Sequence, residues 1–199
     1  MESHFFNDDP PLNYFIPGQQ ARYIEKIMYF FNQNNPNTKI IIIRPTEIFG
    51  IYDDFNLKTS HALPAYISKL YSAYKNNQRY ITASGNIFNI KNYLFCEDLV
   101  KILFKLSKKN LKKNFYTFNL SSENNYSIKQ LFKILKNINI FHNIQISYID
   151  NPKNYKISKR VLVNKKIKNE IGELSQTSME SAIKKIINWY DKEYYKNFK

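Results

Sequence analysis

The stretch KIIIIRPTEIFGIYDDFNLKTSHALP, residues 39–64, decides the fold and holds most of the candidate site. It begins with four isoleucines in a row, and a continuous β-branched run is typical of a parallel-sheet strand with both faces covered. Polar side chains follow, including Thr46, Glu47 and His61. Open α/β sheets bind ligands where their strands end. The stretch therefore predicts a buried strand followed by a binding loop.

Helical and extended patterns alternate on either side of this strand. Apolar residues recur at three- and four-residue spacing in the helical segments, and Ser127 and Ser178 are suited to cap two of them. The predicted helices are 19–33, 60–76, 97–108, 128–138 and one after Ser178, and the further predicted strands are 80–82, 93–95, 116–120 and 143–149. Residues 1–18 and 151–160 are predicted to be loops. This alternation indicates an α/β fold with a mainly parallel sheet.

Composition limits the class of protein. A length of 199 residues allows one domain or two small ones, and a 43% hydrophobic content excludes a disordered chain. No apolar run approaches the roughly 20 residues of a membrane span. The single cysteine, Cys96, excludes an intramolecular disulfide and a cysteine-rich zinc site, so a reducing compartment, the cytoplasm, is expected.

The formal charge of +14 suggests nucleic acid as a partner. However, the lysines are scattered through every helical segment without an arginine-rich run. Lys, Asn, Ile, Tyr and Phe are also over-used together, as AT-rich codons would impose. We therefore interpret the charge as compositional and do not expect a nucleic-acid partner. A basic cleft for a diphosphate needs only a few of these charges.

Five blocks of the sequence resemble GDP-L-fucose synthases, of the extended short-chain dehydrogenase/reductase and NAD-dependent epimerase/dehydratase superfamily. The pair DDF and SHALP within the first block is fairly specific to this family and its close relatives. The blocks are RPTEIFGIYDDFNLKTSHALPAYISKLYSAY (44–74), NIKNYLFCEDLVKIL (89–103), YTFNLSSENNYSIKQLFKIL (116–135), YIDNPKNYKISKRVLVNKKI (148–167) and TSMESAIKKIINWY (177–190).

The resemblance implies a partial Rossmann-like, mainly parallel sheet together with a smaller α/β substrate domain. Residues 1–59 would be a remnant of the dinucleotide-binding domain. Residues 60–199 would be the GDP-sugar domain, with elements that return to the Rossmann sheet. The blocks match only the C-terminal two-thirds of such an enzyme, which suggests a truncated or split chain. A homodimer, or a separate N-terminal half, is the expected protein partner.

The activity implied by the resemblance is the NADPH-dependent conversion of GDP-4-keto-6-deoxy-mannose to GDP-L-fucose. His61 matches the histidine that acts as general acid in epimerisation, a step suited to an imidazole. Residues 45–48 match the loop at the nicotinamide end of NADP: Pro45, Thr46, Glu47 and Ile48. The GDP contacts are matched by Lys69, Lys91, Lys159 and Arg160, and lysine keeps the charge but loses the bidentate fork of arginine. The alternative is that these four residues are solvated charges.

Two parts of the family's machinery are not matched by these residues. The chain contains Gly18, Gly50, Gly85 and Gly172, and no G-x-G-x-x-G sequence follows a predicted strand. The Tyr-x-x-x-Lys pair should lie near residues 14–22, where the choice is between Tyr14 followed by Gly18, or Gly18 followed by Arg22. A degenerate, non-catalytic homologue that acts as a binding or regulatory subunit is therefore the alternative function.

Structural roles are the preferred interpretation of the remaining candidate residues. Asp53 and Asp54 predict a turn in preference to a metal site. Glu97 and Asp98 suit a helix N-terminus, where acidic side chains complement the helix dipole. Cys96 lies in an apolar segment and is interpreted as a core residue.

Overall fold

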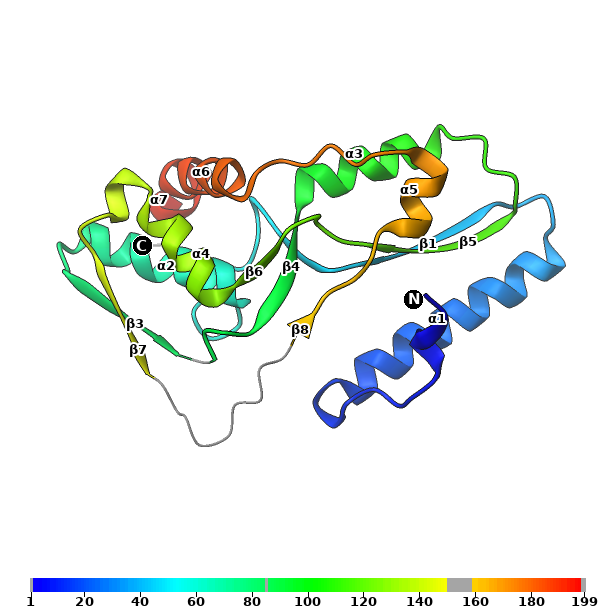
Figure 1. Ribbon diagram of the computed structural model, residues 1–199, viewed down its shortest axis with the longest axis horizontal. Coiled ribbons are helices and arrows are strands. Elements are labelled where there is room, and N and C mark those ends of the chain that lie inside the picture. The colour runs from blue at the N-terminus through cyan, green and yellow to red at the C-terminus, as the bar shows by residue number, and fades with distance from the viewer. Residues whose placement is uncertain (1, 85, 150–158, 198–199) are drawn as a thin grey trace. The chain divides into compact units, whose positions relative to one another are not determined.

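The computed structural model describes residues 2–84, 86–149 and 159–197, and the chain divides into two compact units (Figure 1). Unit 1 comprises residues 1–46, 102–121 and 162–174, and unit 2 comprises residues 47–101, 122–161 and 175–199. The boundary expected after residue 59 thus lies inside unit 2. Each unit is assembled from three separate segments, because strands paired in space are far apart in sequence.

Unit 1 is built on two parallel strands. β1 (Ile40–Pro45) pairs with β5 (Phe115–Leu120), so that Ile40 lies beside Phe115 and Pro45 beside Leu120. Figure 1 shows α1 (Phe15–Asn34) and α5 (Lys165–Ile171) on opposite sides of this pair. The short 3₁₀ turns Glu2–Phe6 and Leu12–Tyr14 precede α1. Ser121 and Asn164 tie α5 to the end of β5, since the Ser121 N–H donates to Asn164 Oδ1 at 2.7 Å.

Unit 2 contains two small sheets. In the first, β4 (Ile90–Phe95) pairs in parallel with β2 (Glu47–Phe49) and β8 (Lys159–Arg160), and antiparallel with β6 (Asn125–Ser127). In the second, β3 (Tyr80–Ser84) pairs in parallel with β7 (Gln145–Ile149). The helices are α2 (Ala62–Lys75), α4 (Ile128–Lys136), α6 (Met179–Trp189) and α7 (Tyr195–Asn197), with a 3₁₀ turn at Asn139–Phe141 and a π-helical turn at Tyr190–Tyr194. Helix α3 (Cys96–Ser107) begins in unit 2 and ends in unit 1. The α/β class with mainly parallel pairing is confirmed.

The core of unit 2 lies between α2, α4, α6 and the strands. It is rich in aromatic side chains, among them Phe55, Tyr71 and Phe132, each at most 2% exposed. The two predicted caps hold α4 and α6 in place. Ser127 forms a capping box with Gln130, and the Ser178 hydroxyl accepts the N–H of Ser181. Both caps satisfy backbone groups that the first helical turn would leave without partners.

Helix α1 differs from its prediction in two ways. It begins at Phe15 instead of residue 19, because proline at position 17 is tolerated in a first helical turn, where its missing N–H has no helical acceptor. The predicted apolar face is also largely exposed: Ile24, Ile27 and Phe31 are 57%, 42% and 44% accessible. The apolar periodicity predicted the helix correctly, but the apolar face of the helix does not face the core of unit 1.

The exposed face of α1 predicts self-association of the purified chain. Exposed apolar patches of this kind drive association, and an open strand edge adds to the tendency. We expect the weight-average mass in sedimentation experiments to rise with protein concentration. Replacing Ile24 and Phe31 by glutamate should abolish that rise, because a charged side chain opposes burial of the face. A concentration-independent monomer would contradict the prediction.

Candidate functional site

An ion pair joins the two strands that carry Glu47 and Lys91. Glu47 on β2 lies beside Tyr93 on β4, and Lys91 precedes Tyr93 by two residues, so the three side chains share one face of the sheet. The Lys91 Nζ donates to Glu47 Oε2 at 2.5 Å, and the side chains are 29% and 16% exposed. The other carboxylate oxygen, Oε1, and the Tyr93 hydroxyl are buried without a hydrogen-bond partner among the described residues. Burial, together with the Glu47 charge, raises the pKa of Tyr93.

Two further predicted anion ligands lie beside Lys91. β8 pairs with β4 in parallel, placing Lys159 beside Ile90 and Arg160 beside Lys91. Lys159 is exposed. The side chain of Arg160 and residues 150–158, which include most of the predicted loop 151–160, lie outside the described part of the chain, and the last two residues of that prediction form β8. The backbone register thus brings three of the four predicted GDP-contact residues to one corner of the sheet.

The loop before α2 is held by aspartates. The Asp54 N–H donates to Asp53 Oδ1 at 2.8 Å, and Asp54 accepts from the Asn56 N–H at 2.9 Å and from the Thr59 hydroxyl at 2.5 Å. The bonds from Thr59 and from the Asn56 N–H lower the pKa of Asp54. The predicted turn is therefore confirmed, and the described residues contain no group of three His, Cys, Asp or Glu that could hold a metal ion.

His61 stands at the N-terminus of α2, exposed and next to that loop. Burial raises the pKa of Asp53, whereas the charge of His61 lowers it, so the two groups are electrostatically coupled. The Asp53 Oδ2 and Ser60 Oγ atoms are buried without partners in the described structure. The imidazole therefore lies beside a small group of polar atoms that the fold itself does not use.

Lys69 lies two turns further along α2, about 12 Å from His61 along the helix axis. Its Nζ reaches the Thr82 carbonyl on β3 at 3.4 Å, a long bond to the second sheet of unit 2. His61 therefore lies next to the loop 50–60, whereas the Lys69 side chain contacts β3.

The predicted nicotinamide loop continues β1. The Thr46 N–H extends the β1–β5 ladder by donating to the Leu120 carbonyl at 2.8 Å, and its Oγ1 is buried without a described partner. Pro45 is exposed, and Ile48 is 38% accessible. Contact of these residues with a cofactor stays a prediction.

The segment that should carry the Tyr-x-x-x-Lys pair has a different structure. Tyr14 precedes α1 and is half exposed. Gly18 packs on Pro10, and a Cβ at Gly18 would lie 2.6 Å from the proline Cγ. Arg22 donates to the Asp8 carbonyl and stacks over Phe5, with its carbon Cζ 5.6 Å from the ring centre. The N-terminal segment therefore holds both positions through contacts that a tyrosine and a lysine would not make.

These residues can bind NADP only if the chain also provides a site for the cofactor's pyrophosphate. A dinucleotide needs a glycine-rich turn at a helix N-terminus for close backbone approach. Gly18 lies within α1, Gly50 packs against Cys96, and Gly172 ends α5 with φ of 77°. Gly85 is outside the described residues. The described residues thus do not form a pyrophosphate cradle, and at most the nicotinamide end fits here.

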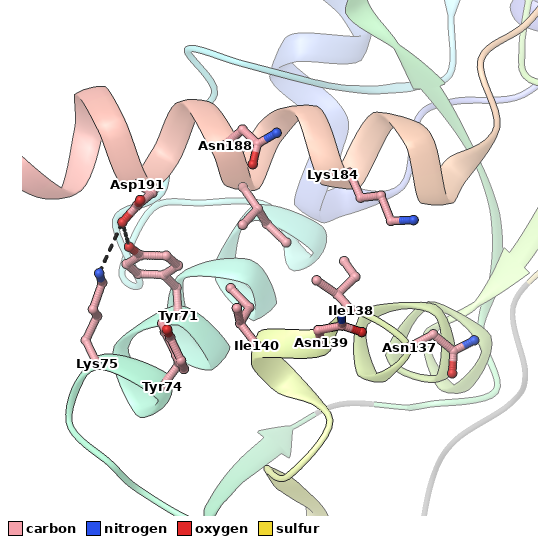
Figure 2. Close-up of a pocket in the computed structure, with 11 residues that line it drawn as sticks. Tyr71, Tyr74, Lys75, Asn137, Ile138, Asn139, Ile140, Lys184, Asn188 and Asp191 are labelled. Carbon is pink, nitrogen blue, oxygen red and sulfur yellow. Dashed lines mark hydrogen bonds and ion pairs between the residues drawn. The ribbon is translucent and has the colours of Figure 1, made fainter.

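A cavity of about 420 Å³ lies away from this cluster, between α2, the loop after α4, and α6 (Figure 2). The Tyr71 hydroxyl donates to Asp191, whose Oδ1 lies 3.1 Å from Lys75 Nζ. Burial and the Asp191 hydrogen bond raise the pKa of Tyr71 to about 12. The helical periodicity of α2 places its tyrosines on the apolar face, and only their polar ends, which periodicity does not report, reveal the cavity. Its other lining residues are Tyr74, Asn137, Ile138, Asn139, Ile140, Lys184, Ile187 and Asn188.

The remaining candidates have structural roles. Burial raises the pKa of the Cys96 thiol, as expected of a core cysteine and not of a nucleophile. Glu97 pairs with Lys185 at 2.6 Å, and Asp98 accepts hydrogen bonds from Thr177. No helix among the described residues has the length and apolar character that crossing a bilayer requires.

No family model matches the chain, but its sequence is similar to those of known proteins. A GDP-L-fucose synthase of Dictyostelium discoideum is 26% identical over 156 residues, covering 78% of this chain and 48% of that protein. A GDP-L-colitose synthase of Yersinia pseudotuberculosis is 21% identical over 165 residues, covering 83% and 52%. The chain therefore spans about half the length of the curated relatives it matches.

Solved structures agree with this likeness in fold. A GDP-L-fucose synthetase from Naegleria fowleri bound to NADP superposes with a TM-score of 0.84 at 22% identity, covering all of this chain and 62% of that one. A UDP-glucose 4-epimerase from Thermotoga maritima superposes with a TM-score of 0.70 at 19% identity, covering 89% and 53%. The chain is similar in sequence to GDP-L-fucose and GDP-L-colitose synthases, and it has the Rossmann-like fold of the extended short-chain dehydrogenase/reductase epimerases and reductases.

Proposed function

We propose that this chain binds a GDP-linked 4-keto-6-deoxy sugar as part of an NADPH-dependent epimerase and reductase of the GDP-L-fucose synthase kind. The observation that carries the proposal is the sequence match to two GDP-sugar synthases over about four-fifths of the chain. The corner of β4 and β8 supports it, because Lys91, Lys159 and Arg160 are adjacent there in backbone register. Lysine and arginine are the usual partners of phosphate oxygens.

In this proposal a base removes the proton from one face of the sugar carbon, and His61 donates a proton to the other face of the resulting enolate, which inverts the carbon. An imidazole exchanges protons near neutral pH, which suits a general acid. The exposed position of His61 at the start of α2 leaves the ring accessible to a ligand. The described residues provide no cradle for the NADP pyrophosphate, so the proposed roles of this chain's residues concern the sugar and its diphosphate.

The second candidate function is a non-catalytic, GDP-sugar-binding subunit. One observation favours it: in the register aligned on the helix, Gly18 takes the tyrosine position and packs against Pro10, and Arg22 takes the lysine position and donates to the Asp8 carbonyl. Glycine has no proton to give, and arginine cannot release one near neutral pH. Binding would then persist without reduction at C4.

A calorimetric titration tests the binding that both candidates share. We expect GDP-mannose and GDP to bind more tightly than UDP. Lys69→Ala should weaken GDP binding about tenfold, the usual consequence of losing one charge-assisted hydrogen bond. Lys112→Ala is the matched control, because it removes the same charge from an exposed position in unit 1. Equal binding of GDP and UDP, or none of either, would overturn the assignment.

Proton exchange separates the two candidates. When the chain is incubated with a GDP-4-keto-6-deoxy sugar in D₂O, a catalytic chain should exchange the protons at C3 and C5. His61→Asn should slow that exchange at least a hundredfold, the usual contribution of a positioned acid or base, while leaving the affinity for GDP unchanged. Binding without exchange in the unaltered chain would favour the non-catalytic subunit.

A further inference from the structure

We infer that Glu47 is a specificity-determining residue that restricts anion binding at Lys91. The inference rests on the proposed function, because it concerns how a diphosphate would reach the same corner of the sheet. In the structure the Lys91 ammonium is already taken by the Glu47 carboxylate at 2.5 Å. Any phosphate oxygen that uses Lys91 must therefore displace or share with an internal anion.

Glu47 competes with a phosphate for Lys91, and burial of the ion pair strengthens Glu47 in this competition. Glu47 is 16% exposed, whereas the Lys184–Glu180 pair on α6 is 57% and 51% exposed. Ion pairs in water are strongly screened, but a half-buried pair is screened much less. A solvated pair such as Lys184–Glu180 therefore exchanges partners readily, and the Glu47–Lys91 pair does so at a greater cost.

The second carboxylate oxygen makes displacement harder still. Glu47 Oε1 is buried without a partner, and the Tyr93 hydroxyl beside it is also unpaired in the described structure. Moving Lys91 onto a phosphate would leave a buried carboxylate with neither charge partner nor hydrogen bond, which is strongly unfavourable. The negative charge of Glu47 would in addition repel the incoming phosphate.

The same geometry indicates which ligand group can bind beside Lys91. A neutral hydroxyl can accept a hydrogen bond from the partly exposed Lys91 ammonium without breaking the ion pair. The cluster therefore favours a sugar hydroxyl over a phosphate oxygen at this position. A ligand that places its diphosphate against Lys91 therefore binds weakly to the unaltered chain.

Substitutions at Glu47 test the inference with three probes: GDP, guanosine and inorganic pyrophosphate. Glu47→Gln keeps the side-chain shape and removes the charge, so Lys91 is freed. We expect GDP and pyrophosphate to bind about tenfold more tightly to Glu47→Gln than to the unaltered chain, and guanosine to bind equally. In the Lys91→Ala background the same change should give a clearly smaller gain, because only the repulsion by the Glu47 charge is then relieved. Glu180→Gln is the matched control, since it adds the same net charge through a solvent-exposed pair.

Each outcome separates the inference from the proposed function. Unchanged pyrophosphate and GDP affinity in Glu47→Gln, or an equal gain in Glu180→Gln, overturns the inference alone. A gain for pyrophosphate with no preference for GDP over UDP supports the inference and overturns the proposed function. Glu47→Asn serves as a second neutral variant should Glu47→Gln fold poorly, and near-UV circular dichroism checks the fold of each.

Discussion

Replacing Asp98 by alanine should lower the free energy of unfolding by about 3 kcal/mol, the cost of breaking a buried hydrogen-bond network. Asp98 is 2% exposed. Its two oxygens accept the Thr177 N–H at 2.7 Å and the Thr177 hydroxyl at 2.8 Å. Thr177 stands just before the Ser178 cap of α6, so the carboxylate fixes how the chain enters that helix. Without it, the Thr177 N–H and hydroxyl would lose their acceptors at the start of α6.

Urea denaturation followed by circular dichroism measures this loss. Asp98→Asn should recover part of it, since an amide oxygen can still accept one bond. The matched control is Glu180→Ala, which removes a carboxylate from an exposed pair and should cost less than about 1 kcal/mol. A loss below 1 kcal/mol for Asp98→Ala would show that Thr177 finds water instead. Asp98 would then not anchor α6.

The elements that sequence predicted best are those with a strong local signal. Four isoleucines in a row predicted the strand β1, which is half-buried and not covered on both faces as expected, and Ser127 followed by Gln130 is the kind of signal that fixes where α4 begins. β2 and β6 have only three residues each, too few for any periodicity, and they exist because β4 lies between them. The start of α1 was predicted too late because the Pro-Gly pair at 17–18 is usually a helix breaker.

The candidate site is harder to predict because its contacts are non-local. Glu47 and Lys91 are 44 residues apart, and only the pairing of β2 with β4 brings them together. Nothing within either segment says that the lysine is already paired. In the same way, Tyr71 and Asp191 are 120 residues apart and meet where α2 packs against the π-helical turn that follows α6. Sequence patterns predict which residues carry charge, but the fold decides which charges remain available to a ligand.

Alkaline pH should destabilise unit 2 strongly, because burial raises the pKa of several of its tyrosines. The group comprises Tyr66, Tyr71, Tyr93, Tyr126, Tyr148 and Tyr190. A raised pKa of an acid means that the folded state holds the proton more tightly than the unfolded state. The stabilisation is therefore complete below about pH 10, the ordinary tyrosine pKa, and is lost as pH rises through the folded-state values.

Tyr71 allows the size of this effect to be measured at one residue. Its pKa of about 12 corresponds to a loss of about 1.4 kcal/mol at pH 11 relative to pH 8. Tyr71→Phe removes that loss, at the cost of the Asp191 hydrogen bond, worth about 1 kcal/mol at neutral pH. The variant should therefore be less stable than the unaltered chain at pH 8 and about equally stable at pH 11. Urea denaturation at both pH values checks this, with tyrosinate absorbance near 295 nm reporting the titration directly. If both proteins lost the same free energy between pH 8 and pH 11, Tyr71 would not be held protonated by the fold.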